Sequence, residues 1–542
     1  MKKLAWFSRS SVIVFLILLS LKAYAERDCS AEVMTTEGAV KGFEEQGYGV
    51  CAWKGIPYAA PPVGNLRWKK TQPPLPRSAV LEATQVGMSC PQKEEITSGG
   101  KSIGFSEDCL FLNIWSPKNQ DNGKLSPVMV YFHGGGFQQG SGGYTMYDGN
   151  YLAGQKDVVL VTVNYRIGAL GFLALPELRQ EDPDGSTGNY GILDQIQALK
   201  WLKANIKNFG GDPNRIMIFG QSAGGMSVCV LMVSPLSEGL FERAVSMSGP
   251  CELFFTMEEG FEQGKEFAER VGCSGDRVLD CLRSKPADAL VVKSGNRLLN
   301  LGVTYAPHID GYVLPDFPIK LIKQGKYHRV PFMVGNTKEE LRLYTMMFSG
   351  IGLIQPHTIN WLMRKLVAGN YVEEILAMYN YKDYRRPIDL FLNVATDMVF
   401  SGPAWQMAEA MWDKNPVYMY RVDWNDHNFP HKMGAFHGID VPLVFGTIQD
   451  KNFLSQLLAS KPVLERAKPL SEQMMSYYTN FARTGNPNGE GLLEWTAYDP
   501  EKKSRIIFDT PITISPLSEQ EIKRLAYFEQ NPMKKIVKVR KK

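Results

Sequence analysis

Short, mainly hydrophobic runs recur along this chain, and most of them are bounded by glycine or polar residues. Runs of this length are typical of strands that are buried on both faces of a sheet. The six runs that predict central strands lie at 128–132, 158–165, 215–219, 243–249, 330–336 and 417–422. The alternating segment 110–115 predicts a further strand, and 40–58 predicts small strands joined by glycine turns.

Segments with helical spacing lie between these runs, notably 190–202 and 226–232. Longer helical or irregular stretches occupy 257–300 and 340–415. Strands that alternate with helices predict an α/β fold with a large, mostly parallel sheet, helices on both faces and long helical insertions. No linker rich in Pro, Ser or Gly divides residues 26–542, which favours a single domain.

The N-terminus has the pattern of a secretory signal peptide. Lys2, Lys3 and Arg9 precede the apolar run 12–19, and Ala-Tyr-Ala ends at Ala25. The alternative is a retained membrane anchor, but the run is shorter than the ~20 residues that span a bilayer. We therefore expect residues 1–25 to be removed near Ala25, a secreted or periplasmic protein, and no stable membrane anchor.

The formal net charge of +4 does not describe the body of the chain. Four basic residues precede position 26, and six more lie in the tail 534–542, which we expect to be solvated and disordered. The body between them is therefore acidic. This balance disfavours a nucleic-acid partner.

All eight cysteines follow residue 25, which places them in an oxidising compartment if the leader is removed. Sequence alone leaves their pairing open. The pairs that would close short loops are Cys90 with Cys109, Cys273 with Cys281 and, less closely spaced, Cys29 with Cys51. Cys229 lies within an apolar helical segment and is predicted to be buried and free. No CxxC, HxxxH or HExxH spacing predicts a metal site.

The sequence Gly220-Gln221-Ser222-Ala223-Gly224 joins a predicted buried strand to a predicted packed helix. A strand that reverses sharply into a helix leaves little room for side chains, and Gly220 and Gly224 remove them where the two would collide. Ser222 then stands at the apex, near the positive end of the helix. This geometry favours a nucleophile, although a glycine-rich turn with an ordinary serine has the same pattern.

A serine hydroxyl needs a base, and the base needs a carboxylate that fixes its tautomer. His437 lies in a glycine-flanked loop after the late strand 417–422 and is the preferred base. His427 and His431 are predicted to be surface histidines. Glu340 follows the strand 330–336 and is the preferred carboxylate, with its neighbour Glu339 as the rival.

Acyl transfer also needs hydrogen-bond donors for the oxyanion. The residues 134–136 are three glycines directly after the strand 128–132. We predict that the backbone N–H groups of Gly135, Gly136 and Ala223 form the oxyanion hole. His133, which precedes the glycines, is predicted to be a structural hydrogen bonder.

At this point the chain resembles the carboxylesterase/cholinesterase family (type-B carboxylesterases) of the α/β-hydrolase fold. The resemblance covers nearly the whole mature chain. The motifs that carry it are KGIPYA at 54–59 with PPVG at 61–64, SEDCLFLN at 106–113, HGGGF at 133–137, GQSAGG at 220–225, GAFHG at 434–438 and NFARTGNPN at 480–488.

The resemblance implies Ser222 as nucleophile, Glu340 as acid and His437 as base, with no cofactor or metal and a small-molecule ester as substrate. It also implies the disulfides Cys90–Cys109 and Cys273–Cys281. Two structural features follow in the same way: an Arg67–Glu107 salt bridge and a buried Ser248 behind the triad.

Three departures from the family bear on specificity. Gln221 stands where the family usually has Glu, which should weaken attraction for cationic substrates. The segment between Cys90 and Cys109 has no Trp, which argues against choline esters. Leu301 and Val303 fall where acetylcholinesterases carry bulky phenylalanines, so we expect an acyl pocket that accepts more than acetyl.

The sequence therefore predicts a serine carboxylesterase. Two alternatives use the same fold. One is a lipase or acyltransferase with the same triad, which differs in its lid loops and acceptor access. The other is a non-catalytic adhesion or binding protein, which is disfavoured because no triad residue is missing.

Overall fold

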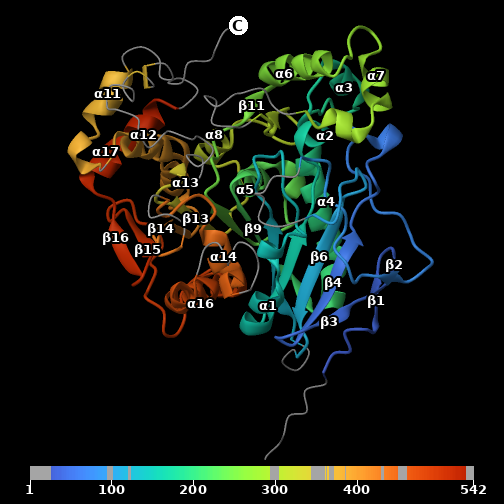
Figure 1. Cartoon of the computed structure of the whole chain (residues 1–542), viewed down its shortest axis with the longest axis horizontal. Helices are drawn as coiled ribbons and strands as arrows, with labels where there is room; N and C mark the ends of the chain where they lie inside the picture. Colours follow the sequence, from blue (N-terminus) through green and yellow to red (C-terminus); the bar gives the residue numbers. More distant parts are fainter. Residues whose placement is uncertain are drawn as a thin grey trace, which may run out of the picture.

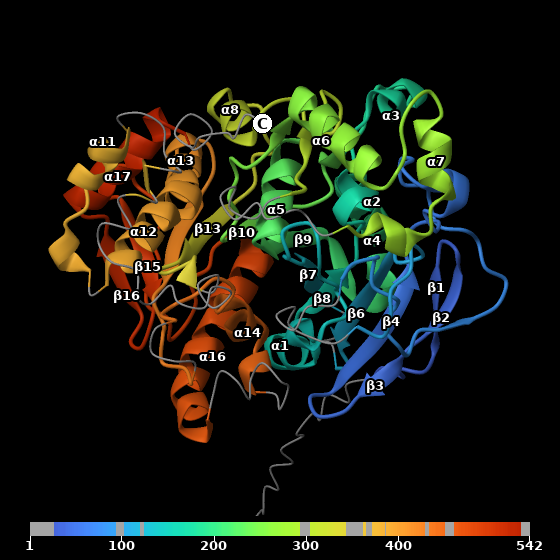
Figure 2. The ribbon, with the colours of Figure 1, turned by 45° about the horizontal axis from the view of Figure 1, so that its top comes forward.

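The computed structural model describes residues 26–93, 102–119, 124–292, 304–342, 361, 363–364, 371–384, 386–428, 433–449 and 460–532. Its centre is an eleven-stranded sheet, which crosses the molecule in Figures 1 and 2. In spatial order the strands are β16 (Thr513–Pro516), β15 (Ser504–Phe508), β14 (Val417–Val422), β13 (Phe332–Thr337), β10 (Arg243–Met247), β9 (Gly211–Gln221), β7 (Ser126–Phe132), β8 (Val159–Val163), β6 (Phe111–Pro117), β4 (Val50–Pro57) and β3 (Phe43–Glu45).

In this spatial order, the seven neighbouring strands β15, β14, β13, β10, β9, β7 and β8 run parallel to one another. Both edges are antiparallel, with β16 at one end and β6, β4 and β3 at the other. All six predicted central strands lie in the parallel part, so the predicted α/β architecture with a mostly parallel sheet is confirmed.

Helices bury both faces of this sheet. Val128, Val130 and Phe132 of β7 belong to one hydrophobic core and Met129 and Tyr131 to another, as expected for side chains that alternate along a strand. The first core is covered by α4 (Tyr190–Asn205) and α5 (Ala223–Val233), and the second by α14 (Asp440–Phe445) and α16 (Lys461–Thr484). Because neither face of the sheet is exposed to solvent, the central strands have hydrophobic residues at nearly every position.

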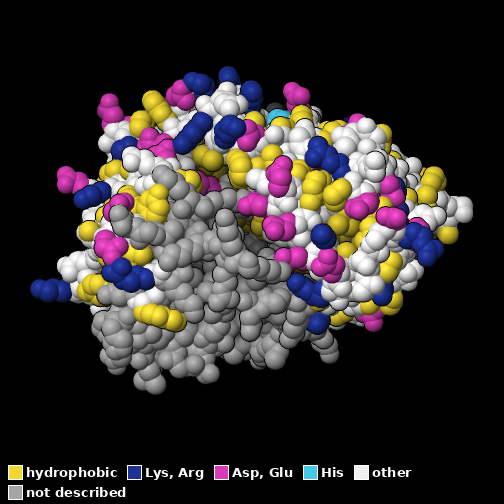
Figure 3. All heavy atoms as spheres, turned by 90° about the horizontal axis from the view of Figure 1, so that it is seen from above, with side chains coloured by type: hydrophobic (Ala, Val, Ile, Leu, Met, Phe, Trp, Pro, Cys, Tyr) yellow, Lys and Arg dark blue, Asp and Glu magenta, His cyan; other side chains and the backbone are white. Residues whose placement is uncertain are grey.

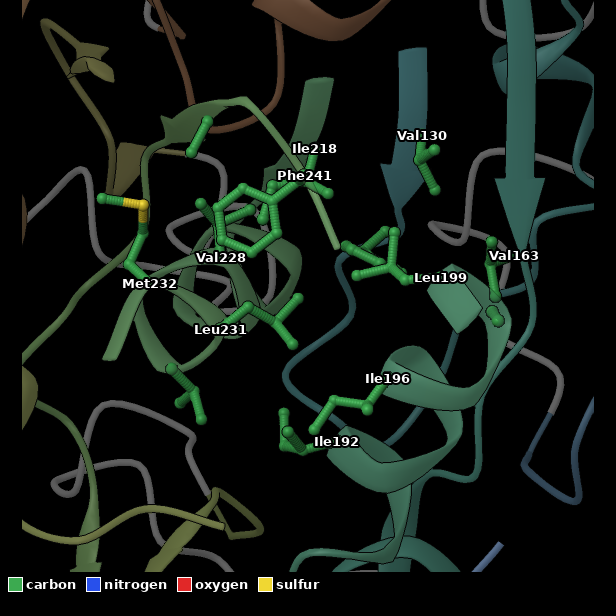
Figure 4. Close-up of a cluster of buried hydrophobic side chains, with 14 of the residues drawn as sticks. Val130, Val163, Ile192, Ile196, Leu199, Ile218, Val228, Leu231, Met232 and Phe241 are labelled. Carbon is green, nitrogen blue, oxygen red and sulfur yellow. The ribbon is translucent and has the colours of Figure 1, made fainter. Parts of the chain in front are cut away.

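Figure 4 shows part of the first core. Val130 and Ile218 project from the sheet toward Ile196 and Leu199 of α4 and Leu231 of α5. This packing fixes α5 against β9, and therefore fixes the turn that joins them.

Further elements surround this body. A small sheet contains β1 (Glu32–Thr35), β2 (Gly38–Lys41) and β5 (Leu81–Glu82), and β11 (Phe255–Thr256) pairs with β12 (His308–Ile309). The larger covering helices are α1 (Asn150–Lys156), α6 (Met257–Arg270), α7 (Val278–Ser284), α8 (Pro318–Lys323), α11 (Tyr371–Ala377), α12 (Pro387–Thr396), α13 (Gly402–Met411) and α17 (Glu519–Gln530). A π-helical turn at Asp397–Ser401 joins α12 to α13.

All eight cysteines are paired: Cys29–Cys51, Cys90–Cys109, Cys229–Cys251 and Cys273–Cys281. The pairs expected from the resemblance are confirmed, but the prediction that Cys229 is free is wrong. Its helix packs so closely on the loop after β10 that a Cβ on Gly225 would lie 2.8 Å from Gly249 Cα. That close approach brings Cys251 beside Cys229. An apolar setting is compatible with either state of a cysteine, so the sequence did not distinguish them.

The expected Arg67–Glu107 salt bridge is present. Arg67 Nε and Nη2 donate to the two carboxylate oxygens at 2.7 and 2.5 Å. Its Nη1 also donates to the carbonyls of Leu282 and Lys285 at 3.1 and 2.7 Å. Both partners are largely buried, and these hydrogen bonds compensate the cost of removing the two charges from water.

In the part of the chain that the structure describes, no helix has the length and apolar character needed to cross a membrane. Four predictions lie outside the described residues. These are the signal peptide at 1–25, the acyl-pocket residues Leu301 and Val303, the surface position of His431, and the basic tail at 534–542.

Candidate active site

The turn between β9 and α5 has the sharp geometry that its glycines predict. Ser222 is the residue between them, with φ 60° and ψ −121°. A Cβ on Gly220 would lie 2.5 Å from the backbone of Gly224, and a Cβ on Gly224 would lie 1.9 Å from the Phe132 carbonyl oxygen. A serine at positive φ costs about 1–3 kcal/mol and persists only where its surroundings impose it. The close packing of strand on helix imposes it here.

His437 faces a buried carboxylate. Its Nδ1 makes a short contact with Glu340 Oε2. The other oxygen of Glu340 accepts hydrogen bonds from Ser248 Oγ and the Thr337 backbone N–H, both at 2.7 Å. Both of these hydrogen bonds go to Oε1 of this fully buried carboxylate, which leaves Oε2 to accept from the imidazole. Nδ1 therefore carries the proton that Glu340 accepts, which leaves a lone pair on Nε2.

The second ring nitrogen of His437 lies beside the turn that carries Ser222. Nε2 is 3.1 Å from the side-chain nitrogen of Gln221, the residue directly before Ser222. The ring of Phe400, on the π-helical turn, lies against the imidazole with a centroid distance of 5.3 Å. The structure thus brings together the elbow, the imidazole and the carboxylate, which come from three distant segments.

The rival carboxylates have different positions. Glu339 does not contact the ring in any described interaction. It accepts from the Ala435 N–H at 2.6 Å and donates its own N–H to the Ala435 carbonyl at 3.0 Å. Gly434 has φ +57°, and a Cβ there would lie 2.0 Å from Glu339 Oε2. Glu339 therefore shapes the backbone of the histidine loop, and Glu340 faces the imidazole.

The prediction that His427 is a surface histidine is wrong. Its side chain is buried, and Nε2 lies 2.8 Å from the Gly434 carbonyl oxygen. The ring also packs edge-on against Phe436. The polar neighbours in its sequence point outward, and this histidine instead supports the loop that carries His437. His431 lies outside the described residues.

The glycine loop after β7 lies against the elbow. A Cβ on Gly134 would be 2.7 Å from the Gln221 carbonyl oxygen and 3.1 Å from Ser222 Cβ. Gly135 and Gly136 have φ +114° and +60°, conformations that L side chains rarely adopt. The loop therefore passes close to Ser222 only because these three positions lack side chains.

His133 is a structural group, in agreement with its prediction. Its Nδ1 lies 2.8 Å from the Gly134 carbonyl oxygen, and its ring stacks on Tyr165 at 4.4 Å. Burial lowers the pKa of His133 to about 4. The ring is therefore neutral at pH 7 and fixes the start of the glycine loop.

Asp440 is a further group near the imidazole that the sequence analysis missed. Its side chain is fully buried on α14, three residues after His437. Neither carboxyl oxygen has a hydrogen-bond partner among the described residues. Burial, reinforced by the charge of Glu340, raises the pKa of Asp440 to about 7. Asp440 lies between Ile439 and Val441, and these apolar neighbours were the signal in the sequence that could have indicated its burial.

Among the described residues, no group of three His, Cys, Asp or Glu side chains is arranged to hold a metal ion. On the face seen in Figure 3, acidic and basic side chains are interspersed over the described part of the surface. A surface of mixed sign gives little long-range steering of charged ligands.

The sequence and fold match one family throughout. The model of the "Carboxylesterase family" matches residues 29–524. The chain is 35% identical over 500 residues to the para-nitrobenzyl esterase of Bacillus subtilis (strain 168), covering 90% of this chain and 97% of that protein. It is 35% identical over 535 residues to the liver carboxylesterase of Sus scrofa, covering 90% and 92%.

Solved structures agree. A structure of a PNB esterase superposes with a TM-score of 0.79 and 34% identity, covering 92% of this chain and 99% of that chain. A thermophilic PNB esterase gives the same TM-score and identity, covering 92% and 100%. The α/β-hydrolase fold expected from the resemblance is confirmed. This chain therefore belongs to the carboxylesterase family of carboxylic ester hydrolases.

Proposed function

We propose that this carboxylesterase acts through an acyl-enzyme formed on Ser222, with His437 as general base and Glu340 as the carboxylate that orients it. The observation that carries the proposal is the buried Glu340–His437 pair, in which the second ring nitrogen of His437, Nε2, lies beside the elbow. The strained, half-buried Ser222 at the N-terminus of α5 supports it. Both features are difficult to explain as parts of a purely structural turn.

In the first half of the reaction, His437 Nε2 takes the proton of Ser222 as its Oγ attacks the ester carbonyl carbon. The developing oxyanion accepts hydrogen bonds from the backbone N–H groups of Gly135, Gly136 and Ala223. Glu340 stabilises the imidazolium. The imidazolium then gives its proton to the departing alkoxide, which leaves as the alcohol.

In the second half, water attacks the acyl-enzyme. His437 takes a proton from the water, and the tetrahedral intermediate collapses as Ser222 leaves with that proton. The cycle returns every group to its starting state, so these steps draw on no cofactor. Removal of one oxyanion donor costs about 10²–10³-fold in kcat in enzymes of this type.

The proposed substrates are neutral carboxylic esters. Gln221 supplies no negative charge beside Ser222, which disfavours cationic alcohols. Leu301 and Val303 would provide an acyl pocket larger than acetyl requires. A secreted or periplasmic location, with cleavage near Ala25, fits a chain whose cysteines are all paired.

The test is turnover of p-nitrophenyl esters by Ser222→Ala. We expect a fall of roughly 10⁴-fold or more, because the nucleophile is absent. Ser227→Ala, on the same helix, is the matched control and should keep its activity when folded. A fluorophosphonate should label wild type once, and it should label Ser222. Turnover by Ser222→Ala at the wild-type rate would end the proposal.

A further inference from the structure

The nitrogen that must accept the Ser222 proton already has a hydrogen-bond partner. His437 Nε2 lies 3.1 Å from Gln221 Nε2, and both side chains are more than nine-tenths buried. Because Glu340 accepts the proton on Nδ1, Nε2 is an acceptor in the resting site. The Gln221 amide must therefore donate to it.

This arrangement reverses when the imidazole is charged. After Nε2 takes a proton it becomes a donor, and the N–H groups of the amide would then face another N–H. A half-turn about the last side-chain torsion of Gln221 replaces the amide nitrogen with Oε1, which accepts from the imidazolium. Glutamate would satisfy only the charged ring, and methionine neither state.

The backbone leaves room for both ends of the amide. A Cβ on Gly134 would lie 2.9 Å from Gln221 Oε1, and one on Gly438 would lie 3.7 Å from Gln221 Nε2. The oxygen end therefore lies over the glycine loop, and the nitrogen end lies over the loop that carries His437. Both loops carry glycine where the amide passes.

We propose that Gln221 is a positioning residue for His437, which holds the ring in both protonation states by donating to the neutral imidazole and, after a half-turn, accepting from the imidazolium. The inference rests on the proposed function. Its consequence is that a carboxylate in place of the neutral amide at 221 would favour the imidazolium.

The experiment compares pH profiles of kcat/KM for a neutral p-nitrophenyl ester. In Gln221→Glu the added carboxylate favours the imidazolium, so the acidic limb should move up by about 1–2 pH units. In Gln221→Met both hydrogen bonds are lost, so kcat should fall by about tenfold with little change in KM and no upward shift. Gln324→Glu makes the same chemical change at an exposed position and should leave the profile unchanged.

Other ionisable groups lie on the elements around the site, and all of them stay the same in these variants. They are Glu339 and Glu340 after β13, Asp440 on α14, His133 after β7, Asp397 on the π-helical turn, and the tyrosines Tyr131, Tyr147, Tyr420 and Tyr478. Their titrations contribute to every profile alike. The difference between wild type and variant therefore isolates position 221.

The outcomes separate the two proposals. Loss of turnover in Ser222→Ala with an unchanged acidic limb in Gln221→Glu would keep the proposed function and overturn this inference. Wild-type kcat in Gln221→Met would overturn the positioning role in the same way. Absence of ester turnover in wild type would instead overturn the proposed function. An upward shift in Gln221→Glu, absent in Gln324→Glu, supports the role of Gln221.

Discussion

The buried carboxyl of Asp440 should make the folded protein less stable as the pH rises. Asp440→Asn keeps the shape of the side chain and removes its ionisation. In the folded protein, burial and the charge of Glu340 raise the pKa of Asp440 from 3.8 to about 7. The unfolded chain has no such environment, so it releases this proton at a much lower pH.

The sign follows from which state binds the proton more tightly. Below pH 3.8 both states are protonated and the group has no effect on stability. Between pH 3.8 and about 7 the folded state alone keeps the proton, so stability falls by about 1.4 kcal/mol per pH unit. The loss is about 2 kcal/mol at pH 5 and levels off near 4 kcal/mol above pH 7.

The measurement is the free energy of unfolding in urea, followed by tryptophan fluorescence at pH 5 and pH 8. The free energy of unfolding of Asp440→Asn minus that of wild type should be about 2–3 kcal/mol larger at pH 8 than at pH 5. Any effect of the amide that does not depend on pH cancels in this comparison. Asp276→Asn, at an exposed turn, should show no such difference. Equal differences at both pH values would refute the reasoning and would mean that water or another group already satisfies the carboxylate.

Two further predictions concern the supports of the site. Cys229→Ala with Cys251→Ala opens a 22-residue loop and should lower the free energy of unfolding by about 3 kcal/mol, measured in urea, and an unchanged value would contradict a stabilising bridge. Gly434→Ala places a methyl group against Glu339 and should lower kcat for p-nitrophenyl esters at least tenfold. Gly311→Ala, also at positive φ but with open space around its Cβ, should affect stability alone, and equal kcat losses in both would rule out a specific role for the loop.

Much of the architecture follows from local patterns. The runs at 128–132 and 417–422 are almost entirely hydrophobic, so the sequence indicated that both faces of these strands are buried. The strands β15 and β16 were not predicted. β16 is an edge strand whose residues are mostly exposed, so its hydrophobic pattern is weak. The disulfide partner of Cys229 could not be predicted from the sequence either, because the bond depends on how closely α5 packs on the loop after β10.

The candidate site was predictable where chain geometry alone forces a residue outward. Ser222 satisfies that condition, because the flanking glycines let the strand and the helix pack closely and leave the serine at the apex of the turn. The choice between Glu339 and Glu340 needed the structure, since adjacent residues have the same composition and context. His427 was misread because its neighbours in the sequence are polar, whereas its ring is buried against Phe436.

The turn after β13 carries both glutamates, and this has a consequence for inhibition. The Glu339 side chain holds the backbone of the histidine loop, and the Glu340 side chain determines which ring nitrogen of His437 carries the proton. A small molecule that wedges this turn outward by even one ångström would therefore disturb the aim and the basicity of the ring together. A compound of that kind would silence the enzyme without entering the space that the ester occupies.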